Sequence, residues 1–229
     1  LVNDGFSCSM SADALRAIEK DSRFNANTGT VYLYISPGNG IYGANQSTEL
    51  TTTLSNGIPV SVVHDTILPR LSSFVEFDLD QGLVTLSFSE AVDVESLMFG
   101  KLRFQSNFTL TPAFSYNLTG GICSSGAGCS SGVSVKFQLI PNDLNGIKTV
   151  GVCTSASNCV PNYQQGFVAD FGGNPIGAFF LPANATIHTP VTFINDTTFP
   201  TISNFILDLD ANILLVTFSE PVQSSTIAN

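Results

Sequence analysis

The sequence has no tryptophan and few charged side chains, which make up 11% of its 229 residues. Eight lysines and arginines stand against eighteen aspartates and glutamates, for a formal net charge of −10. With so few cations to neutralise phosphates, neither a nucleic acid nor an anionic membrane is expected as a partner. There is also no run of eighteen apolar residues, so no membrane insertion is expected.

Recognisable catalytic motifs are lacking as well. The two histidines, His64 and His188, lie in linker-like segments, and no nucleophile elbow, zinc-protease helix or glycine-rich phosphate loop occurs. A paired-carboxylate glycosidase stays open, because its two acids can lie far apart in a chain. The acidic residues, however, recur with an internal repeat, as scaffold positions do. We therefore expect no enzyme and no bound organic cofactor.

Four of the five cysteines form two pairs of equal spacing, Cys123 with Cys129 and Cys153 with Cys159. Each pair encloses small or polar residues, and such a span can close as a local disulfide in an oxidising compartment. A zinc site is the alternative, but its usual ligand spacing and accompanying histidines are missing. We expect two disulfides in an extracellular or cell-surface protein. Cys8 is then free, bonded to another chain, or paired outside this sequence.

An internal repeat of about 130 residues organises the chain. Residues 59–92 align with residues 190–222, with one single-residue slip. The offset is 131 before the slip, as from Phe74 to Phe205, and 130 after it. Further upstream, DALRAIEK corresponds loosely to DLNGIK near the same offset.

The repeat frame divides the chain into three pieces if HDTILP and NDTTFP are taken as linkers. Residues 1–68 are expected to form the C-terminal part of one repeat and residues 69–199 a complete repeat. Residues 200–229 are expected to supply only the N-terminal strands of a further repeat. The frame is thus expected to be cut at both termini.

The fold of each repeat is predicted from periodicity. Apolar residues alternate along two related segments, at Val84, Leu86 and Phe88 and at Leu214, Val216 and Phe218. The preceding LDQG and LDAN supply residues that tolerate positive φ, which predicts hairpins. Further alternating runs (KLRFQSNFTL, VSVKFQLI, GFVADF, TVYLYIS) are separated by turn signals, as in an antiparallel sandwich, and DALRAIEK and DLNGIK predict single helical turns. We predict an all-β chain of tandem immunoglobulin-like antiparallel β-sandwich repeats.

The phrases FDLDQGLVTLSFSEAV, LDLDANILLVTFSEPV, DLNGIK and VADFGGNPI resemble a known family. They are similar to the tandem immunoglobulin-like repeats of large surface and fibril proteins in algae and other aquatic microbes. The resemblance spans the whole chain, although its motifs are structural signatures that carry no chemistry. It implies an extracellular, often glycosylated, fibrous or appendage-forming role. Ala91, which stands where the second copy has Pro221, departs from the pattern.

The apolar residues near the C-terminus suggest how subunits assemble. A two-stranded hairpin is marginal alone, and leaving Leu214, Val216 and Phe218 in water would forfeit on the order of 5–9 kcal/mol. Residues 1–68 have the complementary defect, because they lack the first strands of a repeat.

We hypothesise a structural subunit of an extracellular glycoprotein filament. Residues 200–229 would complete residues 1–68 of the next subunit, which gives a head-to-tail helical homopolymer. The two pieces together still lack a portion that corresponds to about residues 100–130. The alternative is a fragment of a long multi-repeat cell-surface adhesin or glycan-binding protein, in which further sequence completes the partial repeats.

Three further site hypotheses concern sugars and calcium. N-glycans are expected at five sequons, at Asn45, Asn107, Asn117, Asn184 and Asn195. Exposed aromatic rings could present a glycan-binding surface, with candidates at Tyr32, Tyr34, Tyr42 and Tyr163. Core filling or glycan contact within the same molecule explains these tyrosines equally well.

Calcium could bind acidic pairs at the hairpin mouths, at Asp78, Asp80, Asp208 and Asp210, helped by Asp65, Asp196 or Glu90. Alternatively, these aspartates hydrogen-bond the turn backbone. Glu90 and Glu220 are expected to bond neighbouring backbone amides.

Overall fold

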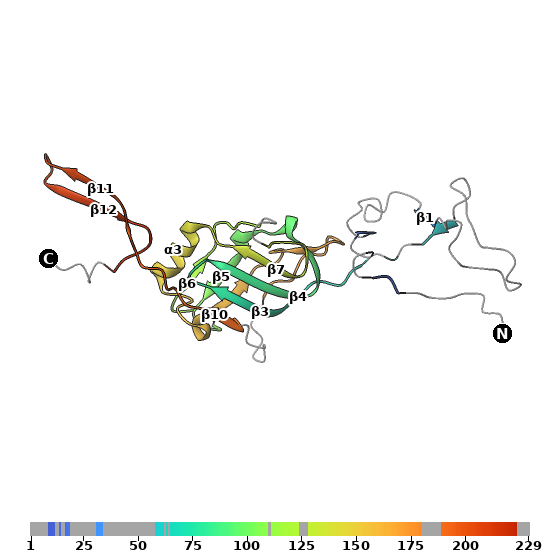
Figure 1. The fold of residues 1–229 in the computed structure, drawn as a ribbon. Coiled ribbons are helices and arrows are strands. Elements are labelled where there is room, and N and C mark those ends of the chain that lie inside the picture. Colours follow the sequence, from blue (N-terminus) through green and yellow to red (C-terminus); the bar gives the residue numbers. More distant parts are fainter. Residues whose placement is uncertain are drawn as a thin grey trace, which may run out of the picture. The chain divides into compact units, whose positions relative to one another are not determined.

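A computed structural model shows the helices and strands that the chain forms (Figure 1). It describes residues 9–11, 14, 17–18, 31–33, 58–61, 63, 65–109, 111–123, 128–179 and 189–223. The chain divides into two compact units, Leu1–Ile67 and Leu68–Asn229.

The first unit contains a short antiparallel strand pair. Strand β1 (Val31–Leu33) pairs with β2 (Ile58–Val60), and Val31 lies opposite Val60. Two described residues that follow β2, Ser61 and Val63, are exposed and lie outside any strand. The helical turn expected at DALRAIEK falls mostly outside the described residues, although Ala14, Ala17 and Ile18 in this segment are helical.

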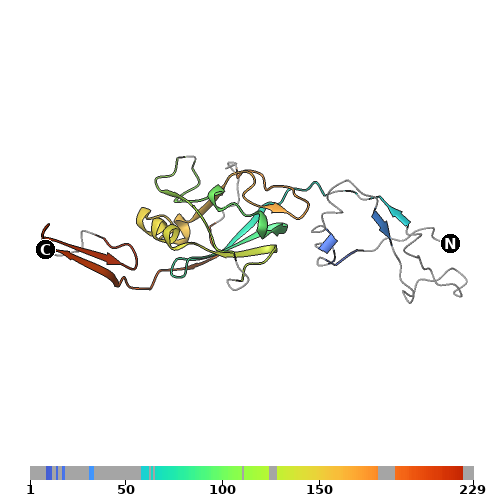
Figure 2. The ribbon, with the colours of Figure 1, turned by 90° about the horizontal axis from the view of Figure 1, so that it is seen from above.

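The described residues of the second unit form three sheets, two of which pack together, and Figure 2 shows the unit from above. The larger sheet has the order β10–β3–β4–β7, with β9 paired to β4, and the smaller has the order β6–β5–β8. Neighbouring strands are antiparallel except β10 and β3, which are parallel. The larger sheet comprises β3 (Leu71–Asp78), β4 (Leu83–Asp93), β7 (Gly132–Gln138), β9 (Ala169–Asp170) and β10 (Thr192–Ile194). The smaller comprises β5 (Leu102–Gln105), β6 (Ser115–Asn117) and β8 (Val160–Tyr163).

The two sheets share one hydrophobic core. The ring centroid of Phe104 in the smaller sheet lies 5.9 Å from that of Phe74 and 5.2 Å from that of Phe77 in the larger sheet. The predicted apolar face of β4 is confirmed, because the described core includes Val84, Leu86 and Phe88, although Thr85 between them is buried as well. The described part of the chain is mostly β-sheet and thus all-β in class. We call residues 71–194 the two-sheet body.

Helix α3 (Pro141–Val150) crosses the end of the two-sheet body. It is longer than the single turn expected at DLNGIK. Pro141 suits its first turn, where backbone N–H groups need no intrahelical partner. It ends at Gly151, which has φ +75°. A Cβ at Gly146 would overlap the ring of Tyr116, so glycine permits this close approach. Among the described residues of the body there are three 3-10 turns, at Val94–Ser96, Phe99–Lys101 and Ala156–Asn158.

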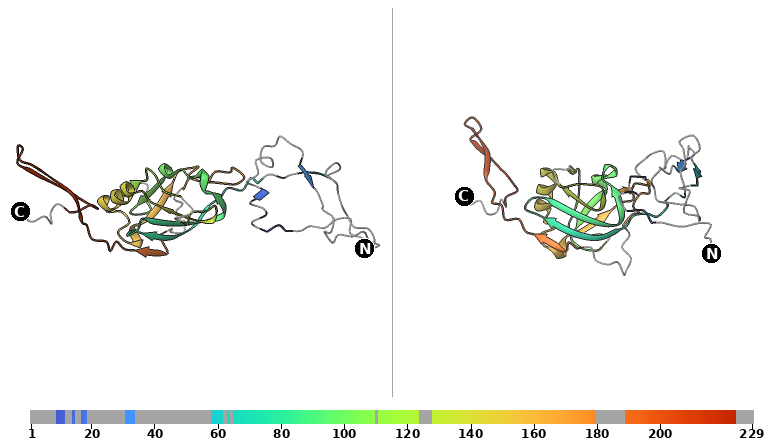
Figure 3. Two further views of the ribbon diagram at one scale, coloured as in Figure 1. Left: turned by 45° about the horizontal axis from the view of Figure 1, so that its top comes forward. Right: turned by 45° about the vertical axis from the view of Figure 1, so that its right-hand side comes forward.

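The C-terminal hairpin forms a two-stranded sheet of its own (Figure 3). It consists of β11 (Ile202–Asp208) and β12 (Ile213–Phe218). Its register matches that of β3–β4. Phe205 lies opposite Val216, as Phe74 lies opposite Leu86. The aligned sequences therefore form hairpins with the same pairing.

The single-residue slip in the alignment has a structural cause. Strand β3 has a register shift between Phe74 and Glu76, where it carries one residue more than β4. Strand β11 continues from Phe205 to Ile206 without such a shift. This β-bulge changes the offset between the copies from 131 to 130.

The two turns confirm the predicted use of residues that tolerate positive φ. Gly82 in the β3–β4 turn has φ +70°, and Asn212 at the corresponding position has φ +54°. The hairpins differ in burial, however. Every side chain of β11 is exposed. Large exposed apolar residues of the C-terminal hairpin include Ile202, Phe205, Ile206, Leu207, Leu209, Ile213, Leu214 and Leu215.

Candidate functional site

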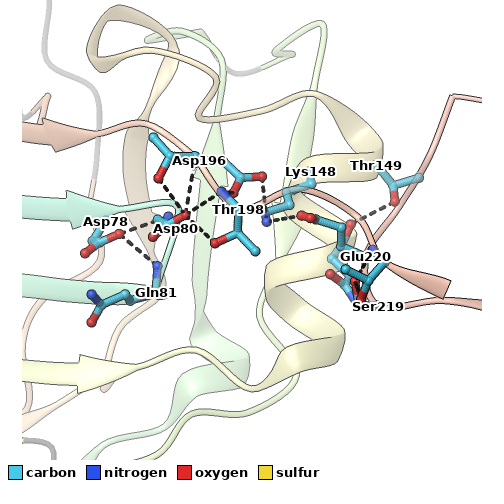
Figure 4. A network of polar contacts seen from close by, with 12 residues as sticks. Asp78, Asp80, Gln81, Lys148, Thr149, Asp196, Thr198, Ser219 and Glu220 are labelled. Atoms are coloured by element: carbon cyan, nitrogen blue, oxygen red, sulfur yellow. Dashed lines mark hydrogen bonds and ion pairs between the residues drawn. The ribbon is translucent and has the colours of Figure 1, made fainter. Parts of the chain in front are cut away.

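A polar cluster around Lys148 joins the two-sheet body to the C-terminal hairpin (Figure 4). Lys148 lies in the last turn of α3. Its Nζ lies 2.7 Å from Oδ2 of Asp196 and 2.8 Å from Oε2 of Glu220. Only 13% of the Lys148 side chain and 10% of the Glu220 side chain are exposed. One ammonium group therefore connects the helix, the segment after β10 and the end of the C-terminal hairpin.

Two opposing effects act on the Lys148 ammonium. Burial by itself lowers its pKa, but the hydrogen bonds to Asp196 and Glu220 outweigh burial, so its pKa lies above the ordinary value. The group is therefore charged at neutral pH. The expectation that Glu220 bonds backbone amides is wrong for Oε2, which accepts from Lys148 instead. Its Oε1 is buried and has no hydrogen-bond partner in the described part of the chain.

Asp80 fixes the segment that leads into the C-terminal hairpin. Its Oδ1 accepts hydrogen bonds from the backbone N–H of Thr197 and of Thr198, both at 2.9 Å. It also accepts from the Thr198 hydroxyl at 2.9 Å. The backbone bond from Thr197 and the hydroxyl bond from Thr198 lower the pKa of Asp80. The β3–β4 turn thus holds the segment after β10 by a charged acceptor.

Two other calcium candidates, Asp78 and Asp208, each accept hydrogen bonds from the backbone of their own turn. Oδ1 of Asp78 accepts from the backbone N–H of Asp80 at 2.9 Å and of Gln81 at 2.8 Å. Oδ1 of Asp208 accepts from the backbone N–H of Asp210 at 3.0 Å and of Ala211 at 2.9 Å. These are the bonds expected of the turn alternative. Calcium at these aspartates stays a prediction.

A cavity of about 290 Å³ lies beside the cluster. Its described lining contains no histidine or cysteine, and its polar groups include Asp80, Gln138, Lys148, Thr198 and Glu220. A lysine neutralised by two carboxylates is a poor general base, because its ammonium is held in the charged form. The geometry therefore suits fixing the position of the C-terminal hairpin better than it suits catalysis.

A second polar centre, which sequence reasoning missed, lies within the two-sheet body. The Asp143 carboxylate is buried and accepts four hydrogen bonds. They come from the Thr119 backbone at 2.8 Å, the Thr119 hydroxyl at 2.7 Å, the Gly120 backbone at 3.0 Å and the Tyr116 hydroxyl at 3.1 Å. Burial raises the pKa of Tyr116, and the bond to Asp143 and its charge raise it further. Asp143 thus fastens α3 to the segment after β6.

The four paired cysteines lie where the sequence predicted them. Cys123 is joined to Cys129, and Cys153 to Cys159, by disulfides. The second pair is fully buried and belongs to the core. Cys8 lies outside the described residues.

The described sequon asparagines are all exposed, at Asn107, Asn117 and Asn195. Asn45 and Asn184 lie outside the described residues. Within the Asn107 sequon, the Thr109 hydroxyl donates to Oδ1 of Asn107 at 2.7 Å. Three sites can therefore be reached by solvent in the folded chain.

The remaining candidates differ in exposure. Leu214 of the expected interface is 60% exposed, and Val216 and Phe218 are partly buried. Tyr32 is 60% exposed, whereas Tyr163 is buried. The hypothesis of a glycan platform at Tyr163 is wrong, because its ring packs against Phe167 and Phe179. Candidates outside the described residues are Tyr34, Tyr42, His64 and His188.

Comparison with family models, curated proteins and solved structures found no match to this chain. Among the residues that the structure describes, there is no helix whose length and hydropathy would let it span a membrane.

Proposed function

We propose that the chain is a structural subunit of an extracellular glycoprotein filament made of immunoglobulin-like β-sandwich repeats. In this proposal, residues 200–229 of one subunit complete the partial repeat of residues 1–68 in the next. The contact is head-to-tail and does not close, so it builds a helical homopolymer. The role is mechanical, and no catalysis or bound cofactor is required.

One observation carries this proposal. The C-terminal hairpin has the register of β3–β4, but most of its apolar side chains are exposed while most of those of β3–β4 lie in the core. For example, the exposed fraction is 60% at Leu207 and 0% at the corresponding Phe77. An apolar surface of this kind marks an interaction site on a folded protein. The matching hairpin indicates that a second sheet is what covers it.

Two further features support an extracellular setting. Disulfides persist in oxidising compartments, and the described residues contain two of them. Three sequon asparagines are exposed, so glycans at Asn107, Asn117 and Asn195 would extend into solvent. Such glycans would increase the solubility of a surface with few charges.

The direct test measures molar mass against concentration by light scattering on residues 1–229. We expect growing oligomers, and fibres in negative-stain micrographs. The control replaces Leu207 by Asp, which places a charge on the exposed apolar face and should give monomers. A monomeric native chain at every concentration would contradict the proposal.

The cluster at Lys148 favours a second candidate. The ion pairs from Lys148 to Asp196 and Glu220 tie a two-sheet body to the hairpin that follows it in the same chain. Consecutive repeats of a long cell-surface adhesin or glycan-binding protein would use the same contact. A longer chain that continues beyond residue 229 and folds as monomeric beads would favour this candidate.

A further inference from the structure

We propose that the free edge of β11 pairs in parallel with the segment of Ser61 and Val63 in a second copy of this chain, and that the contact has a specific register. Ser61 lies opposite Ile206, and Val63 lies opposite Asp208. This inference rests on the proposed head-to-tail assembly, and it adds which strand is bound, in which direction and at which residues.

The template is the parallel pair β10–β3 in the two-sheet body. Thr192 lies opposite Glu76, and Ile194 lies opposite Asp78. Two backbone hydrogen bonds flank this pairing. Val191 N–H donates to the carbonyl of Phe74, and Leu79 N–H donates to the carbonyl of Ile194, both at 2.9 Å. Strand β3 therefore has a partner on each side, β4 and β10.

Strand β11 corresponds to β3 but has a partner on one side only. Within the described residues it pairs with β12 and with no other strand. Leu209, whose counterpart Leu79 binds Ile194, is 76% exposed. An unpaired edge with exposed apolar residues is a template for strand addition.

The chain itself contains the missing strand. By the sequence repeat, PVSVV at residues 59–63 corresponds to PVTFI at residues 190–194. The described residues of this segment are available, because Ser61 is exposed and the exposed fraction of Val63 is 93%. The counterpart Ile194 is 38% exposed within its parallel pair. Strand β11 thus has one unpaired edge in the described part of the chain, and Ser61 and Val63 lie outside any strand and are exposed.

The template also predicts the hydrogen bonds of the contact. Val60 N–H of one copy would donate to the carbonyl of Phe205 in the other. Leu209 N–H of the second copy would donate to the carbonyl of Val63 in the first. Because Thr192 is exposed and Glu76 partly exposed in the template, Ser61 and Ile206 would lie on the outer face of the new sheet. Substitutions at these two positions therefore leave the core intact.

Cysteine cross-linking tests the register. Chains carrying Ser61→Cys are mixed with chains carrying Ile206→Cys, both with Cys8→Ser, and oxidised gently. Residues opposite each other on neighbouring strands meet the Cα separation of a disulfide, whereas the adjacent residue points to the other face. We expect about tenfold more mixed disulfide dimer with Ile206→Cys than with the matched control Leu207→Cys.

The outcomes separate the inference from the function on which it rests. Oligomers without a preference for Ile206→Cys over Leu207→Cys would overturn the register and leave the filament in place. If most dimers join two chains that both carry Ile206→Cys, β11 pairs with β11 of another copy, and this result would also overturn the proposed register. A third sample is a single chain that carries both Ser61→Cys and Ile206→Cys. If the disulfide forms only within this chain and never between chains, the contact does not involve a second copy. A monomeric native chain would contradict the proposed function itself.

Discussion

Phe205 and Phe74 hold the same position in two hairpins, opposite Val216 and Leu86, but 67% of Phe205 is exposed against 1% of Phe74. The same residue type in the same register thus has two environments. The difference lies in what covers the hairpin, because the body supplies a second sheet only to Phe74. This pair allows packing and assembly to be tested separately.

Replacing each phenylalanine by alanine should have opposite consequences. Phe74→Ala removes a ring from the core and should lower the free energy of unfolding by about 3–5 kcal/mol. Phe205→Ala should change it by no more than about 0.5 kcal/mol in the monomer and should weaken oligomerisation. Urea denaturation and light scattering give the two readouts. Equal destabilisation by both substitutions would show that Phe205 is already buried in the monomer.

Lys148→Met should release the C-terminal hairpin. Without the ammonium, Asp196 and Glu220 lose a charge-assisted partner, which costs about 1.5–3 kcal/mol. Protease cleavage near residues 195–201 should accelerate about tenfold or more, since 1.4 kcal/mol corresponds to a factor of ten in an opening equilibrium. Lys136→Met is the matched control, because its pair with Glu76 is long, at 3.9 Å, and more exposed. Equal cleavage of both variants would argue against the role of Lys148.

Asp143→Ala should destabilise the two-sheet body by about 1–3 kcal/mol for each donor that stays buried without an acceptor. The milder Asp143→Asn should also lower the pKa of Tyr116 toward its ordinary value. Burial raises the pKa of Tyr163 as well, independently of Asp143, which makes it the internal control. Tyrosine ring chemical shifts, followed by NMR against pH, report each of these two groups separately. An unchanged Tyr116 titration in the asparagine variant would contradict the assignment.

The raised pKa of Tyr116 also sets the direction of a pH effect. The folded chain favours neutral Tyr116, so this contribution to stability is complete below the unfolded pKa of about 10. It is lost as the pH rises through the higher folded pKa.

Asp80 predicts an effect at the acidic end. Its folded pKa is lowered by bonds from Thr197 and Thr198, so its contribution is present above the unfolded pKa of about 3.9. The contribution is lost as the pH falls through the folded pKa. The amide chemical shift of Thr197, whose N–H donates to Asp80, should therefore titrate below the ordinary range of aspartate, and Asp80→Asn should abolish the transition. A midpoint above 4 would contradict this assignment.

Glycan occupancy is expected at the exposed sequons. In a eukaryotic secretory host, glycosidase treatment should lower the intact mass of the chain. Asn107→Gln, Asn117→Gln and Asn195→Gln should each remove one glycan, because all three side chains are exposed. Unchanged masses after treatment would show that the sequons are unused.

The longer strands could be predicted from sequence, because the alternation of apolar and polar residues shows locally which face of the strand is buried. This holds for Val84 and Leu86, and the hairpin turns follow from residues such as Asn212 that accept positive φ. Strands of three or four residues such as β6, β8 and β10 are too short to show a period. The sequence therefore leaves a core position and an exposed position open for Tyr163, and in β8 its side chain is buried in the core.

The Lys148 cluster could not be predicted, because its partner Glu220 lies 72 residues away and no local pattern connects them. The repeat offered a signal, since FSE occurs at the end of both hairpins, but only the fold brings the second copy to α3. Asp143 was likewise hidden within a helical motif. Its four donors lie 23 to 27 residues earlier in the chain, on a segment whose path the sequence does not specify.

The parallel pairing of β10 with β3 determines how the two-sheet body responds to tension. Strand β3 lies at the beginning of the body and β10 at its end, so pulling on the flanking chain slides the two strands past each other lengthwise. Parallel ladders have evenly spaced, slanted hydrogen bonds, and sliding loads all of them at once, whereas peeling breaks them one by one. Stretching this body therefore meets a shear geometry, which suits a load-bearing element.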